Sequence, residues 1–408
     1  MSEVVSIPQL RFPEFRDEWR VDKFVDLCKF QQGVQVDVEL QSTEPKNNFL
    51  RFLRIENYTQ KSNDFRYIPK ELSSNKSITE NEIAIVRYGA TAGYIGRGLK
   101  GVLANNLFKL VLNKDTLDTD YLFHLLRSYK TFCFFQSEMS GGAMPALSFG
   151  IVGALKLPYS SISEQQKIAA FLTAVDNKIE QLSKKQELLG EYKKGLMQQI
   201  FSQAIRFKAD DGSDFPDWKE KKLENVLKRT STGLNPRQNF KLGYGENYYV
   251  TIKNISNGKL DFSKCERIDE NAMTMIANRS DLSKGDLIMS SIGNVGESYL
   301  LDKEPENWNI NESVFMLRAS ELMLPQFLYF IITNEQSKWY LESNSTGSSF
   351  KSIKLGELKL LPLGLPSLEE QTKIANFLSS IDTKIEQVGK QLDESKQFKK
   401  ALLQQMFV

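Results

Sequence analysis

Histidine and cysteine, which often carry out catalysis or hold a metal ion, are few in this sequence. The chain of 408 residues has one histidine, His124, and three widely separated cysteines, Cys28, Cys133 and Cys265. Metal clusters of His and Cys, and Ser-His-Asp or Cys-His arrangements, need more such residues, and no GxxxxGK[ST] loop is present to hold nucleotide phosphates. His124 lies in an apolar run at residues 121–126, so we expect a buried ring, and three part-buried thiols in a reducing compartment.

Two short stretches resemble catalytic motifs without completing them. Residues 216–222 (PDWKEKK) combine carboxylates with lysines, but they form a charged run, and metal-assisted hydrolysis needs carboxylates that converge in a pocket. Residues 235–238 (NPRQ) lack the second proline and the aromatic residue of the Asn-Pro-Pro-aromatic motif in methyltransferases that modify amino groups. We therefore expect a chain that is not an enzyme, binds no metal and carries no cofactor of its own.

Basic side chains interleaved with aromatic ones occur in both halves of the chain, and they are the remaining candidates for a binding function. Lys and Arg can hold DNA phosphates, and Arg can also bind guanine edges. The net charge is only +2, yet residues 219–241 hold seven basic and two acidic residues. The candidate DNA contacts in the first half are Arg51, Arg54, Lys61, Arg66, Arg87, Tyr88 and Arg97. Those in the second half are Lys228, Arg229, Arg237, Lys241 and Lys253, and a solvated charged face is the alternative for each cluster.

Small polar loops supply further candidates. Glycine-containing loops at residues 89–97 and 293–297 each follow a run typical of a β-strand, where glycine permits a tight turn or a close backbone approach. A second loop follows in each half, at residues 140–149 and 345–351. The candidate DNA contacts from these loops are Ser148, Asn294, Ser348 and Lys351.

A duplication must position these residues. Residues 164–182 (EQQKIAAFLTAVDNKIEQL) return 206 residues later as residues 370–388 (EQTKIANFLSSIDTKIEQV). Continued to residues 201 and 407, the two stretches are identical at 19 of 38 positions. Upstream matches are fainter, and they include LKLP at residues 155–158 and LKLLP at residues 358–362. The chain is therefore expected to contain the same structural unit twice.

Both repeated stretches have the periodicity of a coiled-coil seam. Apolar residues recur at alternating spacings of four and three, which favours two long helices packed on one another over two separate amphipathic helices. The seam positions of the first stretch are Ile168, Leu172, Val175, Ile179, Leu182, Leu189 and Leu196. Those of the second are Ile374, Leu378, Ile381, Ile385, Val388, Leu392 and Leu402. Polar residues interrupt the seam at Gln186, Lys193, Ser395 and Lys399, and Ser163 and Ser367 are the expected helix N-caps.

The expected fold is α+β, with a globular unit of mixed helix and strand followed by a long helix, and this arrangement occurs twice. Strands are predicted near residues 82–88, 107–112, 286–291 and 313–317, with one short helix near 118–130 and another near 324–340. The expected domains are residues 1–157, 158–206, 207–361 and 362–408, in which the second and fourth ranges are the helices of an antiparallel coiled coil. Neither an N-terminal signal nor an apolar run of about 18 residues is present, so we expect no membrane segment and a cytoplasmic protein.

Along essentially its whole length the sequence resembles the specificity subunit of a Type I restriction-modification system. The resemblance rests on the duplicated helix pattern E-Q-x-K-I-A-x-F-L-x-x-[VI]-D-x-K-I-E-Q, on the LKLP and LKLLP segments before it, and on the glycine loops that follow strands. It implies two target recognition domains, each of which binds one half of a split, asymmetric site in double-stranded DNA, and a helix pair that sets their spacing.

The resemblance also implies partners. Two methyltransferase subunits, which use S-adenosylmethionine to methylate adenine, would dock on the chain, and two ATP- and Mg-dependent motor-nuclease (restriction) subunits would complete the complex. The residues themselves are compatible with this interpretation, because two similar units related by a pseudo-two-fold axis could meet the two strands of DNA in the same way. A two-armed protein scaffold without DNA contact is the alternative that the sequence leaves open.

Overall fold

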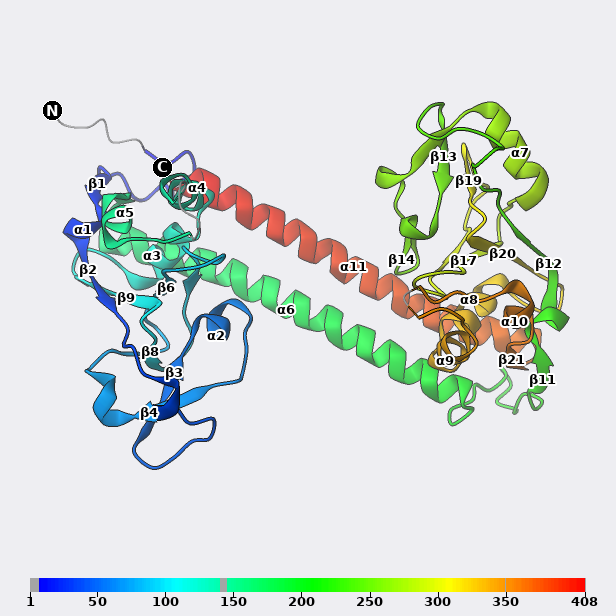
Figure 1. Ribbon diagram of the computed structural model, residues 1–408, viewed down its shortest axis with the longest axis horizontal. Helices are drawn as coiled ribbons and strands as arrows, with labels where there is room; N and C mark the ends of the chain where they lie inside the picture. Colours follow the sequence, from blue (N-terminus) through cyan, green and yellow to red (C-terminus); the bar gives the residue numbers. More distant parts are fainter. Residues whose placement is uncertain (1–6, 140–144, 349, 408) are drawn as a thin grey trace. The chain divides into compact units, whose positions relative to one another are not determined.

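The computed structural model describes residues 7–139, 145–348 and 350–407, and the chain divides into two compact units (Figure 1). The first unit comprises Met1–Ser183 with Gly389–Val408, and the second comprises Lys184–Val388. Both boundaries fall inside long helices, α6 (Ile162–Phe201) and α11 (Leu368–Met406), so each unit contains one end of each helix. The finer division into four domains stays a prediction.

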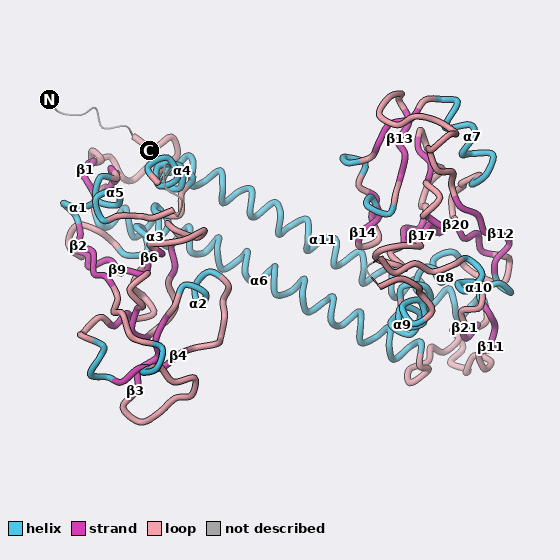
Figure 2. The backbone as a smooth tube through the Cα atoms, in the orientation of Figure 1, coloured by secondary structure: helices cyan, strands magenta, loops and turns pink. Residues whose placement is uncertain are grey.

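The described part of the first unit combines two sheets, a two-stranded ribbon and short helices (Figure 2). One sheet is antiparallel, in the order β2 (Cys28–Gln32), β9 (Leu107–Leu112), β6 (Ala84–Val86) and β7 (Ile95–Gly96). The other has the order β4 (Arg66–Pro69), β3 (Phe49–Leu53), β8 (Gly101–Leu103) and β5 (Ser77–Ile78), with β3 and β8 parallel. The ribbon pairs β1 (Arg20–Lys23) with β10 (Lys156–Tyr159). The helices are α1 (Phe24–Leu27), α2 (Ile55–Thr59), α3 (Thr119–Leu126), α4 (Tyr129–Glu138) and α5 (Phe149–Ala154), with 3-10 turns η1 (Val38–Leu40) and η2 (Lys70–Ser73).

The second unit repeats this plan with local differences. Its antiparallel sheet has the order β12 (Leu227–Thr232), β20 (Val314–Ala319), β17 (Leu287–Ser290) and β18 (Ser298–Leu300). A second sheet has the order β16 (Glu266–Ile268), β13 (Asn247–Val250) and β19 (Trp308–Ile310), beside the hairpin β14 (Ile255–Ser256) and β15 (Lys259–Leu260). The ribbon pairs β11 (Lys219–Lys222) with β21 (Pro362–Leu365). The helices are α7 (Glu270–Ser280), α8 (Pro325–Thr333), α9 (Glu335–Ser343) and α10 (Leu355–Lys359), with 3-10 turns η3 (Leu223–Val226), η4 (Ile252–Asn254) and η5 (Phe262–Lys264).

A glycine follows the edge strand of the antiparallel sheet in each unit, and close backbone packing requires it. A Cβ atom on Gly33 would lie 2.2 Å from the carbonyl oxygen of Ala104, and one on Gly233 would lie 1.7 Å from that of Ile310. Any side chain at either position would therefore force the two sheets of that unit apart. The equivalence of these two positions confirms that the repeat extends beyond the long helices.

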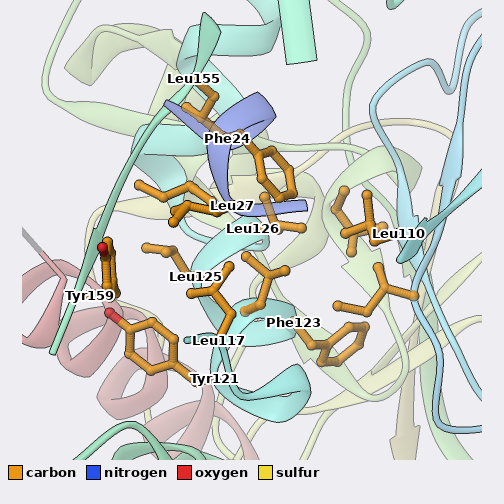
Figure 3. Close-up of a cluster of buried hydrophobic side chains, with 14 of the residues drawn as sticks. Phe24, Leu27, Leu110, Leu117, Tyr121, Phe123, Leu125, Leu126, Leu155 and Tyr159 are labelled. Carbon is orange, nitrogen blue, oxygen red and sulfur yellow. The ribbon is translucent and has the colours of Figure 1, made fainter. Parts of the chain in front are cut away.

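The core of the first unit surrounds α3, which is apolar on most of its surface. Figure 3 shows buried side chains from α1, β9, α3 and the ribbon in one cluster, including Phe24, Leu110 and Tyr121. The Tyr121 ring is fully buried, and its hydroxyl donates to the carbonyl oxygen of Pro158 at 2.8 Å. This cluster continues onto the long helices through Ile168 and Leu402.

The acidic residue that opens each repeated helix stretch is a buried anchor. Glu164 is fully buried, and its carboxylate accepts from Arg11 Nε at 2.7 Å and from Trp19 Nε1 at 3.4 Å. Glu370 is equally buried, and it accepts from Arg206 Nη2 at 2.8 Å and from Trp218 at 3.0 Å. Each carboxylate thus fixes the start of a long helix to the segment that precedes a globular unit.

The following glutamine binds backbone groups in the same way in both units. The Gln165 amide donates to the carbonyl oxygens of Ser160 and Thr116 at 2.8 and 2.9 Å, and its oxygen accepts from the Asp118 amide at 2.9 Å. Gln371 makes the three equivalent bonds, to Pro366, Leu322 and Leu324. The repeated Glu-Gln pair is therefore explained by packing of the helix start on the unit.

The two expected N-caps differ in outcome. Ser367 caps α11, because its hydroxyl accepts from the Glu370 amide at 3.3 Å. The prediction for Ser163 is wrong: α6 already begins at Ile162, and the Ser161 carbonyl accepts from the Gln165 amide.

Segments of α6 and α11 pack against each other in antiparallel fashion within each unit, which confirms the expected fold. In the first unit, Ile168 and Leu172 near the start of α6 share a core with Leu402 and Met406 near the end of α11. In the second unit the end of α6 meets the start of α11, and Met197 shares a core with Leu378. All fourteen seam positions are buried or partly buried.

The polar seam lysines are paired across the two helices. Lys399 pairs with Asp176 in the first unit, and Lys193 pairs with Asp382 at 2.6 Å in the second. Burial lowers the pKa of Lys399 below its ordinary value, although the Asp176 carboxylate acts in the opposite direction. Along the described ranges, no helix has the length and apolar character needed to cross a membrane.

Candidate nucleic-acid interface

The two loops expected to contact DNA meet in the first unit. Tyr88, at the end of the β6 strand region, forms a β-bridge with Ala146 of the second loop, and the Gly89 amide donates to the Pro145 carbonyl at 3.0 Å. The Leu147 amide donates to the Arg87 carbonyl at 2.8 Å. Residues 140–144 of the second loop lie outside the described residues.

The same junction forms in the second unit. Ile292 bridges Ser352, the Gly293 amide donates to the Lys351 carbonyl at 2.8 Å, and the Ile353 amide donates to Ser291 at 2.9 Å. Gly293 has a φ of +75°, a conformation that favours glycine and turns the loop after the strand. Both units therefore present a paired-loop junction at the same end of the central strand of their antiparallel sheets.

Several predicted basic contacts in the first unit are engaged within the chain. Arg54 pairs with Glu56 and Asp64, at 2.8 and 3.2 Å, and Arg66 lies 4.0 Å from Asp64. Arg97 pairs with Asp120 and stacks on the Phe123 ring. These pairs orient the guanidinium groups and reduce the net positive charge that they offer to a phosphate.

Other candidates in the first unit have no carboxylate partner among the described residues. The Arg51 guanidinium lies 4.2 Å from the centre of the Phe65 ring, and that of Arg87 lies near the rings of Tyr88 and Phe149. Lys61 is exposed on a turn with φ of +52°. Of the predicted contacts in the first unit, these three and the exposed Tyr88 offer an unpaired charge or an aromatic ring to a ligand.

In the second unit most of the predicted basic residues are exposed. Arg229 is engaged, because its guanidinium donates to Asp281 at 2.6 Å and to the Arg279 carbonyl at 3.3 Å. The exposed cations without a carboxylate partner in the described part of the chain are Lys228, Arg237, Lys241, Lys253 and Lys351.

The three polar candidates have different roles. Ser148 caps α5, because its hydroxyl accepts from the Ile151 amide at 3.1 Å. Asn294 and Ser348 are exposed in the loops of the second unit, and the carbonyl of Asn294 accepts from the Ser290 hydroxyl. Ser148 therefore has a local structural role, whereas the two second-unit side chains are open to a ligand.

A polar cavity of about 600 Å3 in the second unit adds residues that the sequence did not indicate. Asn294 and Lys351 line it together with Lys193, Lys194 and Lys338 from the helices. Lys194 and Lys338 both lie within 4 Å of the Glu335 carboxylate, so the lining contains ion pairs as well as free charge. No local pattern could have indicated these lysines, since they come from α6 and α9.

The described residues show no arrangement suited to catalysis. Within them, no group of three or more His, Cys, Asp or Glu side chains could hold a metal ion. His124 is buried as predicted, and its Nε2 lies 3.1 Å from the Thr173 hydroxyl. Burial lowers the pKa of His124 to about 4 and raises that of the Cys28 thiol to about 12, so neither is a reactive group at neutral pH.

Comparison with known proteins identifies the architecture. Residues 16–189 and 216–394 match the family described as Type I restriction modification DNA specificity domain. The MjaVIII specificity subunit, a Type I restriction enzyme subunit of Methanocaldococcus jannaschii, is 26% identical over 97% of this chain and 92% of its own length. The HindI specificity subunit of Haemophilus influenzae is 26% identical over 47% of this chain and 41% of its own length.

Solved structures support the fold. The S subunit of a Type I restriction-modification system from M. genitalium matches with a TM-score of 0.62 at 17% identity, over 99% of both chains. A chain from a study of complex assembly and conformational transition in the Type I system matches with a TM-score of 0.57 at 16% identity, over 95% of this chain and 97% of that one. The repeated globular unit with its long helix is therefore a fold shared with these proteins.

Proposed function

The chain belongs to the Type I restriction modification DNA specificity family, and from this premise we propose that each of its units binds one half of a bipartite, asymmetric DNA site. The observation that supports this most is the paired-loop junction, which occurs at the same place on both antiparallel sheets. Exposed cations near these loops would hold phosphates, and loop side chains would reach base edges. The chain acts as the non-catalytic specificity component.

Exchange of one unit tests this proposal. Replacing residues 208–360 by the equivalent range of a relative with another specificity should change one half of the methylated motif and leave the other. Sequencing of methylated bases in cells that express the variant with its methyltransferase subunits measures both halves. The reciprocal exchange of residues 1–157 is the matched control and should change only the other half.

Two results would contradict the proposal. If both halves change together, the units do not bind independently. If the complex binds DNA without a steep dependence on salt, or binds only through the methyltransferase subunits, the chain is a protein scaffold, because phosphate neutralisation gives a steep salt slope.

We also propose that the paired helices set the number of base pairs between the half-sites. Seven residues lengthen a helix by about 10.5 Å, which corresponds to about three base pairs of duplex. Matched insertion of seven residues after Leu182 and after Val388, both buried seam positions, should lengthen the gap in the methylated motif with both half-sites unchanged. About three base pairs is the upper limit of the shift, because each added base pair also rotates one half-site by roughly 34°.

An insertion of different length is the control for spacing. Insertion of nine residues in place of seven at each site turns the apolar stripe beyond the insertion by a further angle of about 200°. We expect the helices of this nine-residue variant not to pair. An active heptad variant whose gap equals that of the parent would show that the helices do not set the spacing.

Two methyltransferase subunits are proposed to dock along the helices. Tyr192 of α6 and Phe398 of α11 occupy equivalent positions 206 residues apart, and their side chains are 55% and 52% exposed. Aromatic residues, tyrosine among them, are enriched at the centres of protein interfaces, and these two rings offer that kind of contact at matching places on the helices. Tyr192→Ala or Phe398→Ala should each remove one methyltransferase subunit in native mass spectrometry, whereas Val38→Ala, a change at an exposed site on η1, should remove neither.

The proposal also locates the cofactors. S-adenosylmethionine would be bound by the methyltransferase subunits, and ATP and Mg by two restriction subunits, so this chain supplies specificity and no cofactor ligands. We expect such a complex in the cytoplasm, where it meets double-stranded chromosomal DNA.

A further inference from the structure

Arg87 differs from the engaged arginines of the first unit. Its guanidinium lies 4.6 Å from the centre of the Phe149 ring and 5.0 Å from that of Tyr88. Within the described residues its Nε is buried without a hydrogen-bond partner, as is that of Arg54, but unlike Arg54 and Arg97 the Arg87 side chain forms no ion pair. The group is therefore held by two rings, and its hydrogen-bonding capacity is left for a ligand.

A rigid aromatic platform orients this guanidinium. The Phe149 ring is stacked on Phe30 at 5.8 Å with an interplanar angle of 19°, and it meets Phe108 edge-on at 5.2 Å. Phe108 is fully buried in the core of the first unit. A guanidinium placed over a fixed ring has fewer orientations open to its planar donor fork, which favours bidentate binding.

Asn106 adds an unsatisfied acceptor beside this donor. The Arg87 amide donates to the Asn106 carbonyl at 2.9 Å, so the two residues are cross-strand neighbours at the ends of β6 and β9. Their side chains therefore leave the same face of the sheet. The Oδ1 atom of Asn106, like Nε of Arg87, is buried without a hydrogen-bond partner in the part of the chain that the structure describes. Buried polar groups are nearly always hydrogen-bonded, and isolated exceptions also occur at Arg54 and His124. Here an unsatisfied donor and an unsatisfied acceptor lie on neighbouring residues that are themselves partly exposed, next to the paired-loop junction.

The second unit has a complete hydrogen-bonding pattern at the equivalent place. Ser291 and Ser313 stand where the first unit has Arg87 and Asn106, and their backbones make the same bond, at 2.9 Å. The Ser291 hydroxyl donates to the Ser313 carbonyl at 2.7 Å. Leu355, the first residue of α10, stands in place of Phe149, so neither the cation nor the aromatic platform is repeated.

We propose that Arg87 binds the guanine of a G·C pair in the half-site of the first unit, and that the second unit makes no guanine contact from this position. In the major groove a G·C pair presents the O6 and N7 acceptors of guanine beside the N4 amino donor of cytosine. The two guanine acceptors would match the donors of Arg87, and the cytosine amino group would match the acceptor of Asn106. The inference rests on the proposed DNA-binding function and names one specificity-determining residue within it.

The test uses the full chain in complex with its methyltransferase subunits. Duplexes carry the methylated motif of the parent, or the same motif with one base pair at a time replaced. The parent complex should bind the motif about 10- to 100-fold more tightly than the duplex in which this one G·C pair is A·T. Arg87→Lys, which keeps the charge but loses the planar fork, and Arg87→Ser, which introduces the second-unit residue, should lose that preference at one base pair alone.

Controls separate base contact from loss of fold. Discrimination at the second half-site must persist in each variant, which shows that the complex has assembled and binds DNA. Arg127→Lys changes another arginine of the first unit that lies over an aromatic ring, 4.9 Å from the centre of Phe123, and it should leave the motif unchanged. Asn106→Ala should weaken discrimination at the same base pair as the Arg87 variants.

Three outcomes would overturn the inference. An unchanged motif in both Arg87 variants would show that Arg87 contacts no base. Equal weakening on all duplexes with a lower salt slope would make Arg87 a phosphate contact. An effect confined to the second half-site would show that Arg87 does not contact the half-site assigned to the first unit. Failure of the proposed function itself is distinct, because exchange of residues 208–360 would then leave both half-sites as they are.

Discussion

The two units keep the same frame and differ in the side chains that the frame presents. Each has a buried glutamate that accepts from an arginine and a tryptophan, and each has a glycine at the same sheet contact. At the loop junction, however, Arg87 in the first unit corresponds to Ser291 in the second. The two copies therefore agree at the residues that hold the helices and sheets and differ at this position of the loop junction. Such a division suits a protein whose two units bind different half-sites.

A second difference lies beneath the long helices. In the second unit Phe330 is buried, and the Lys193 ammonium lies 5.2 Å from the centre of its ring. In the first unit the equivalent residue is His124, whose Nδ1 is buried without a hydrogen bond, 3.8 Å from Asp176. The same packing position is thus fully apolar in one unit and titratable in the other.

The largest expected effect tests the shared frame. Glu164→Ala and Glu370→Ala each remove a fully buried carboxylate that accepts from a tryptophan and a part-buried arginine, although Arg11 and Arg206 keep backbone carbonyl acceptors. The loss of these charge-assisted hydrogen bonds should lower the free energy of unfolding of each unit by about 3–5 kcal/mol. Native-state hydrogen exchange of peptides from α3 and α8 measures the two units separately. Glu164→Gln and Glu370→Gln keep an acceptor and should cost less.

A surface pair is the control for this comparison. Glu14 pairs with Lys167 in the first unit, and both side chains are nearly half exposed, so Glu14→Gln should leave hydrogen exchange in α3 unchanged. A large effect of Glu164→Ala with none from Glu370→Ala would show that the two anchors are not equivalent, despite their matching hydrogen bonds.

Local patterns in the sequence predicted much of the frame. The apolar spacing indicated the long helices, and strands β6, β9, β17 and β20 overlap the four predicted runs. Near residues 118–130 the single expected helix is instead two, α3 and α4, because Ser128 caps α4 by accepting from the Thr131 amide. Asn334 does the same for α9, and both caps are residue types that could have indicated the break.

Long-range pairing could not be predicted from the sequence. Glu164 has its partners Arg11 and Trp19 at 153 and 145 residues' distance along the chain, so no local pattern indicates that it is a buried anchor. The sequence likewise does not distinguish arginines that form ion pairs from those that do not, because Arg97 and Asp120 come together only in the folded chain. Clusters of basic residues therefore indicate segments that could face DNA. They do not indicate which Lys and Arg side chains remain without an ion-pair partner.

The smaller expected effect concerns His124 and depends on pH. Desolvation lowers the pKa of His124 from 6.5 to about 4, against the attraction of the Asp176 carboxylate and with the repulsion of Lys399. The unfolded chain therefore binds a proton at this residue below pH 6.5, whereas the folded first unit resists protonation until about pH 4. Stability from the neutral ring is fully present above pH 6.5 and is lost as the pH falls toward 4, by at most about 3 kcal/mol.

Exchanging the two ring types separates this effect from general acid denaturation. His124→Phe introduces the residue of the second unit, so the free energy of unfolding of the first unit should lose its extra fall between pH 6.5 and pH 4. Phe330→His should create such a fall in the second unit, where Lys193 and Asp382 take the places of Lys399 and Asp176. Hydrogen exchange in α3 and α8 across this pH range, corrected for intrinsic exchange rates, measures both changes. If the parent and His124→Phe show the same pH dependence in α3, the histidine is protonated in the folded unit, and the Asp176 carboxylate then outweighs burial.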